Sequence, residues 1–194
     1  GPIMMHSVDE EPFASLWQYW NKVRGDRLLP GRRELDFTQL AAILPEMSVL
    51  DIIAPDEMRY RMAGSGLVAR FGGELTGANL LDLFSENSRP TLSQFLTKII
   101  TQPCAGLWHT SVGYQSGRQG AVQLLAVPIK TSDGLPERIV LVQRIDQSGG
   151  ERIDEKLSII GADFFSVNFI DVGAEKPDDH GPSADEAEMA LTSR

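Results

Sequence analysis

The strongest constraint on this chain is a run of three strand-like segments, 106–114, 121–130 and 138–146, separated by short glycine-containing turns. The middle segment carries apolar residues on both of its faces, which is typical of a central strand rather than an edge strand. Connections this short join antiparallel neighbours. The three segments therefore predict a β-meander at the centre of a sheet.

A hairpin is predicted nearer the N-terminus, where segments 48–53 and 58–63 flank a turn that contains Pro and Asp. In the second segment Met58, Tyr60 and Met62 alternate with two arginines. Because successive side chains of a strand point to opposite faces, this alternation places all three on one buried face.

Helical segments lie between the hairpin and the meander. Apolar spacing and glycine or proline boundaries predict short helices over 67–71 and 80–84 and a longer helix over 90–101. Five antiparallel strands with these helices inserted between the second and third strands predict an α+β fold, with the helices on one face of the sheet.

An amphipathic helix is predicted before the first strand, because Phe13, Leu16, Trp17 and Trp20 recur at intervals of three and four residues. Gly25 is the predicted end of this helix. Such a stripe presents two tryptophans either to the domain core or to another chain. We take these four apolar residues as candidates for a dimer interface.

The chain divides into three regions. We predict a tag scar and N-terminal arm over 1–12, a domain with its N-terminal helix over 13–148, and a C-terminal extension over 149–194. In the extension we predict a short helix over 152–160, a strand over 164–172 and a flexible acidic tail. No secretory signal pattern follows the arm, so the expected location is cytoplasmic.

Charge and composition exclude several classes of protein. The 27 acidic and 18 basic residues give a net charge of −9, which opposes binding to nucleic acid. No apolar run reaches the length of about 18 residues that membrane insertion needs. Cys104 is the single cysteine, and the three histidines lie far apart, so neither a disulfide framework nor a metal site is predicted.

Two motifs resemble chemical sites and are better explained structurally. Residues 64–69 match Gly-x-Gly-x-x-Ala, but the preceding strand carries arginines and no second parallel strand follows, so the glycines are expected only to turn a strand into a helix. Cys104 and His109 are five residues apart on a strand, which separates them too far for a thiol and its base. Nothing in the sequence therefore predicts catalysis.

A set of large side chains surrounds the predicted sheet, and we take it as the candidate lining of a ligand cavity. The set comprises Tyr60, Met62, Leu67, Phe71, Phe84, Phe95, Ile99, Trp108 and His109. These residues fit a solid core, and the alternative is a cavity of a few hundred Å3 if the short helices stand off from the sheet. His109 could then act as a lone axial ligand to haem.

Several local strings resemble a known family. They are LWQYWNKVR at 16–24, LPGR at 29–32, LP at 44–45, YRMAG at 60–64 and RFGGELTG at 70–77. Together they resemble the small single-domain PAS proteins of bacteria, specifically PAS family 5, over residues 13–146. The tryptophan helix and the YRMAG string followed by FGGELTG are the most specific parts.

The resemblance implies a PAS-like five-stranded antiparallel sheet with an N-terminal helix, and sensing rather than catalysis. The main hypothesis is a non-enzymatic bacterial regulatory PAS protein that acts through protein–protein contact as a homodimer. The alternative is a sensor that binds haem or a metabolite in the PAS cavity, and the match selects no cofactor. A flavin light sensor would need an Asn-Cys-Arg-Phe-Leu-Gln-type string, whereas Cys104 here follows Gln102-Pro103.

Overall fold

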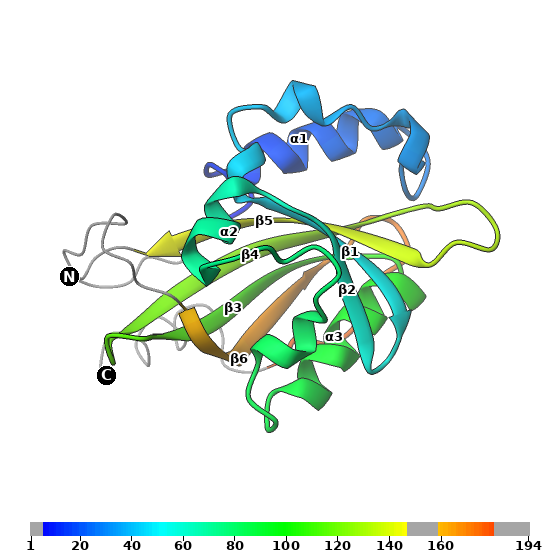
Figure 1. Ribbon diagram of the computed structural model, residues 1–194. Coiled ribbons are helices and arrows are strands. Elements are labelled where there is room, and N and C mark those ends of the chain that lie inside the picture. The colour runs from blue at the N-terminus through cyan, green and yellow to red at the C-terminus, as the bar shows by residue number, and fades with distance from the viewer. Residues whose placement is uncertain (1–5, 147–158, 181–194) are drawn as a thin grey trace.

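The computed structural model describes residues 6–146 and 159–180 and contains one six-stranded sheet (Figure 1). The strand order is β2-β1-β5-β4-β3-β6, and every neighbouring pair is antiparallel. The strands are β1 (Met47–Ala54), β2 (Glu57–Ala63), β3 (Ala105–Tyr114), β4 (Gln119–Ile129), β5 (Glu137–Asp146) and β6 (Ile159–Ile170). The predicted α+β class and the central meander are confirmed, with β4 between β5 and β3.

Helices cover both faces of this sheet (Figure 1). The α-helices are α1 (Phe13–Arg24), α2 (Ser65–Phe71) and α3 (Arg89–Thr101), and the short 3-10 helices are η1 (Arg32–Glu34), η2 (Phe37–Leu40), η3 (Leu44–Glu46) and η4 (Leu80–Leu83). We call the face that α2, η4 and α3 cover the inner face, and the face that α1 covers the outer face. Each face has its own apolar cluster.

The N-terminal helix packs on the outer face of its own sheet. Phe13, Leu16 and Trp20 belong to the same apolar cluster as Leu125 and Val140 of the central strands. The indole Nε1 of Trp20 also donates a hydrogen bond of 2.8 Å to the carbonyl of Pro128. The predicted amphipathic helix is thus confirmed, and the molecule's own sheet is what its apolar stripe buries.

The sixth strand comes from the predicted C-terminal extension and belongs to the same sheet. β6 pairs with β3 over the whole length of β3, from Ala105 opposite Ile170 to Tyr114 opposite Ile159. The chain then turns back, and the backbones of Val167 and His180 exchange hydrogen bonds of 2.9 and 3.1 Å. Most of the predicted helix over 152–160, the tag scar and the end of the acidic tail lie outside the described residues.

No helix among residues 6–146 and 159–180 is long and apolar enough to cross a membrane.

Candidate functional site

The candidate ligand cavity lies on the inner face, between β2, β3, β4, β5, β6 and the short helices. Of the predicted lining residues, Tyr60, Phe71, Phe84 and Trp108 do line it. Leu67, Phe95 and Ile99 are buried in the same inner cluster without reaching the cavity wall. The cavity itself measures about 40 Å3, which is room for about one water molecule.

Aromatic rings fill the space that a ligand would need. The Trp108 ring lies 5.6 Å from both the Phe84 and the Phe95 rings, measured between centroids. Phe95 also contacts Phe164 and Phe169 of β6, at 5.9 and 5.6 Å. Sequence reasoning missed the two β6 rings as part of this face, although the apolar alternation of their segment was visible. In the described part of the chain the inner face is therefore a packed aromatic core around a small void, and a separate pocket of about 340 Å3 lies at its rim, where Leu83, Phe84 and Ala162 line both.

Two polar atoms in the cavity lining have no hydrogen-bond partner among the described residues. They are the indole Nε1 of Trp108 and the hydroxyl Oγ1 of Thr110, and both side chains are buried. A third polar side chain of the lining, Gln143, donates to a Glu46 carboxylate oxygen at 3.3 Å. Burial also raises the pKa of Tyr60, so its phenol stays protonated. Among the polar groups of this lining, the Trp108 indole and the Thr110 hydroxyl are thus the two that lack a partner among the described residues.

Met62 does not line this cavity, which corrects the predicted alternation of β2. Val49 pairs with Met62 and the next residue, Leu50, pairs with Tyr60, so a bulge inserts Arg61 without a partner. A bulge re-aims the side chains that follow it. Met58 and Tyr60 therefore belong to the inner cluster, whereas Met62 packs in the outer one.

His109 is also on the outer face rather than in the cavity. Its strand neighbours Trp108 and Thr110 line the inner cavity, so alternation turns His109 the other way. There its Nδ1 lies 3.0 Å from the Ser166 hydroxyl, and its Nε2 is buried without a partner among the described residues. Burial lowers the pKa of His109 to about 4. His109, the candidate axial ligand for haem, is thus on the face of the sheet opposite the cavity.

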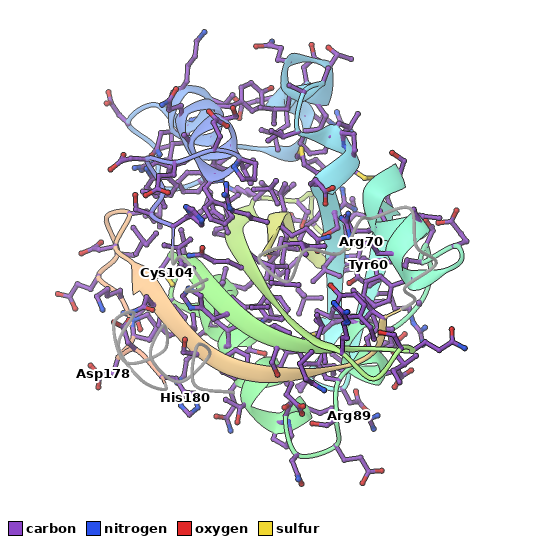
Figure 2. All side chains as sticks on the ribbon, turned by 90° about the vertical axis from the view of Figure 1, so that its left-hand side faces the viewer. Tyr60, Arg70, Arg89, Cys104, Asp178 and His180 are labelled. Atoms are coloured by element: carbon purple, nitrogen blue, oxygen red, sulfur yellow. The ribbon has the colours of Figure 1, made fainter. Side chains whose placement is uncertain are left out.

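The inner face as it stands does not fit a haem or a flavin. Pockets that bind small molecules have volumes of about 300 to 1,000 Å3, against about 40 Å3 here. No histidine lines the cavity, and Cys104 lies in the packed inner cluster at the end of the sheet away from Tyr60 (Figure 2). These residues therefore support no step that runs through such a cofactor.

The candidate dimer contacts divide between buried and half-buried side chains. Phe13, Leu16 and Trp20 are at most 2% exposed, because the chain's own sheet covers them. They are not available to a second copy in this fold, which corrects their assignment as interface residues. Trp17 is half-buried and stacks on Trp20 with 5.7 Å between the ring centroids. It is the one candidate of the four that reaches the surface.

The glycine motif and Cys104, which the sequence offered as candidate chemical sites, both have structural explanations. A Cβ at Gly64 would lie 2.4 Å from the Leu44 carbonyl oxygen, so this glycine lets η3 pack against the start of α2. Burial raises the pKa of the Cys104 thiol to about 12, which removes it as a nucleophile at neutral pH. Among the described residues no group of three or more His, Cys, Asp or Glu side chains could hold a metal ion.

Comparison with known proteins adds the family. The model of the PAS domain family matches residues 8–142, and no curated protein matches the chain. Solved structures similar to this chain include the light state of the blue-light photoreceptor Aureochrome1 LOV, at 18% identity and a TM-score of 0.42, covering 57% of this chain and 88% of that one.

Two further solved structures have similar scores. The Rhodobacter sphaeroides LOV protein is 13% identical with a TM-score of 0.42, covering 60% of this chain and 71% of that one. The PAS domain of an HTR-like protein from Haloarcula marismortui is 14% identical with a TM-score of 0.37, covering 56% of this chain and 90% of that one. The antiparallel sheet, the helices on its inner face and the family match over most of the chain lead to one conclusion: this chain belongs to the PAS domain family.

Proposed function

We propose that this chain is a regulatory PAS protein of the bacterial cytoplasm that performs no catalysis and passes its signal by contact with another protein chain. The observation that carries this proposal is the packed inner face, where aromatic rings leave a void of only about 40 Å3. A ligand can shift a protein only by its differential affinity for two conformations. A void this small gives a large cofactor nothing to bind on the inner face, which favours contact surfaces as the carriers of the signal.

The absence of converging reactive groups in the described residues supports a role without catalysis. General acid–base and nucleophilic catalysis need side chains within hydrogen-bond reach of one another in an accessible site. Cys104 is buried with a raised pKa, and His109 bonds to Ser166 on the other face of the sheet. The His109–Ser166 pair and Cys104 are all buried, so a substrate would not reach them in this fold.

The predicted homodimer is one form of such a contact. Trp17 is the side chain of the tryptophan helix that reaches the surface, so the dimer would use the exposed side of α1. Light scattering across a concentration series, with the Trp17→Ala variant beside the wild type, tests this part. A mass that stays at that of one chain in both proteins would reject the dimer while leaving contact with other proteins open.

The main proposal is tested on freshly purified protein by its absorbance spectrum and its native mass. We expect no band above the aromatic range and a mass of one 21.3 kDa chain or a multiple of it. A Soret or flavin band, or a bound mass of that size, would overturn it. Capture of specific partners from the native host by the untagged chain, absent with an unrelated PAS protein, would identify the contact.

A second candidate function has its own observation, namely the unpaired Trp108 Nε1 and Thr110 Oγ1 in the cavity lining. Unpaired buried polar groups are costly, and a small ligand with a hydrogen-bond acceptor would satisfy them. Such a ligand would have to move the short helix η4, because Leu83 and Phe84 form part of the wall. A small extra native mass that disappears in Thr110→Val would support this sensor.

A further inference from the structure

A second and larger pocket lies on the outer face, on the opposite side of the sheet from the PAS cavity. Its volume is about 270 Å3, close to the lower end of about 300 Å3 for small-molecule pockets. The floor is apolar, with Val49, Met62 and Ile129 of the sheet, and Leu35 and Phe37 form an apolar wall. Three arginines complete the lining: Arg32, Arg61 and Arg138.

The charge in this pocket is unbalanced. Asp51 is the carboxylate that its arginines contact, with one oxygen 2.8 Å from Arg138 Nε and the other 3.6 Å from Arg61. One carboxylate therefore faces two guanidinium groups, and Arg32 adds a third positive charge. Excess positive charge in a confined, partly apolar site attracts anions, even in a chain of net charge −9.

Arg32 is the group that lacks a partner. Its side-chain Nε is buried and has no hydrogen bond in the described part of the chain. Its backbone is held in place, because its N–H donates to the Lys130 carbonyl at 2.9 Å. Arg32 is thus fixed over the end of β4 with an unsatisfied donor, and a buried unsatisfied donor is costly unless a ligand engages it.

Glu34 carries the carboxylate nearest to Arg32 in the sequence, but it does not pair with Arg32. Both oxygens of Glu34 accept hydrogen bonds from Arg27, at 2.6 and 2.7 Å, and one also accepts from the Gly31 backbone at 2.9 Å. These bonds lower the pKa of Glu34 to about 2, so it remains charged and engaged with Arg27. The positive charge of Arg32 is therefore not neutralised from within its own helix.

From this arrangement we infer that the outer pocket binds a small organic anion, with a carboxylate or phosphate group on a short apolar body. Arginine forks bind both headgroups through paired hydrogen bonds. Arg32 would engage the headgroup, and the apolar floor around Met62 would receive the body. The proposed function does not depend on this site, because the site lies on the other face of the sheet.

The test uses the full chain with 13C-labelled methionine methyl groups and three probes: hexanoate, hexyl phosphate and 1-hexanol, at constant ionic strength. The Met62 methyl signal, assigned through Met62→Leu, should move with at least one of the two anions and much less with the alcohol. Met58, which is fully buried on the inner face, is the internal control and should not move. The anion that binds more tightly identifies the headgroup.

Variants of two neighbouring arginines then distinguish binding in the pocket from general attraction of anions to positive charge. Arg32→Gln should raise the dissociation constant about tenfold or more, because it removes a charge-assisted hydrogen bond. Arg33→Gln removes the same charge from an exposed neighbour that does not line the pocket, and should change it less than about twofold. The proposal fails if neither anion moves Met62, if 1-hexanol moves it equally, or if the two variants weaken binding equally.

Discussion

The two faces of the sheet differ in what covers them and in how completely they are filled. On the inner face Phe84, Phe95 and Trp108 pack together and leave about 40 Å3. On the outer face α1 seals one part with Trp20, while a pocket of about 270 Å3 remains beside three arginines. Of these two cavities in the described part of the chain, the one on the inner face is therefore the smaller.

This difference suggests that the two faces of the sheet have different roles, one structural and one in recognition. Aromatic rings contribute apolar area and rigidity, so the inner face acts as the structural core. The outer face combines apolar floor with charges that its own carboxylates do not balance, and such a surface is suited to recognition. Stability should therefore respond most to the packed positions of either face, and binding most to the arginine pocket.

The largest expected effect comes from the seal between α1 and the sheet. Trp20→Ala should lower the free energy of unfolding by about 3–5 kcal/mol, because it empties a buried site and removes the bond to Pro128. Urea unfolding followed by circular dichroism measures this change. Trp17→Ala, at the half-buried neighbour, should cost about 1 kcal/mol or less. Equal losses for the two variants would mean that α1 does not bury Trp20 more deeply than Trp17 against the sheet.

Gly106 tests how tightly α3 lies on the inner face. A Cβ at this glycine would lie 2.8 Å from the Phe95 ring, so Gly106→Ala should cost about 1–3 kcal/mol of unfolding free energy. Gly161 in β6 is the matched strand control, because a Cβ there meets no atom within 4 Å. Thermal unfolding of the two variants should give a clearly lower midpoint for Gly106→Ala alone, and similar midpoints would mean that the inner face is loosely packed.

His109, which is buried on the outer face, should make the free energy of unfolding depend on pH. Its pKa falls from 6.5 to about 4 on folding because of burial, so the unfolded chain binds the proton more readily. The contribution of His109 to the free energy of unfolding is present above pH 6.5 and is lost as the pH falls towards 4. Between pH 7 and pH 5 this loss is about 2 kcal/mol. Urea unfolding at both pH values should show this loss of stability. In the His109→Gln variant, the difference between pH 7 and pH 5 should be smaller by about the same amount. An unchanged pH dependence in the variant would show that His109 is not buried as described.

The smallest expected effect compares the two buried indoles directly. Trp20 Nε1 has a hydrogen-bond partner, and Trp108 Nε1 has none among the described residues. Replacement by phenylalanine removes ring area from both sites, but only Trp20→Phe loses a bond. We expect Trp20→Phe to be about 1 kcal/mol more destabilising than Trp108→Phe in urea unfolding. The reverse order would indicate that the Trp108 indole has a partner, such as a bound ligand.

Much of the fold could be predicted from the sequence because strands and helices leave local patterns. The meander, the first hairpin and the amphipathic helix follow from alternation, helical spacing and glycine turns. The position of Met62 could not be predicted, because the bulge at Arg61 depends on how β2 pairs with β1. A local pattern does not contain that pairing.

The candidate site was harder to predict for the same reason. An apolar stripe shows that Phe13, Leu16 and Trp20 are buried, but not whether a sheet or a second copy buries them. The filling of the inner face by Phe164 and Phe169 depends on the pairing of β6 with β3, some 50 residues earlier in the chain. The arginine pocket unites residues of η1, β2 and β5, so it has no sequence motif.

The packed inner face is tested most directly by a crystal structure of the protein purified from its own host without added ligand. We expect the Trp108, Phe84 and Phe95 rings to fill the space between the sheet and α3, with density for nothing larger than water beside Thr110. Density for an organic molecule or haem in that space, with the rings displaced around it, would show that the inner face is a ligand cavity and not a packed core.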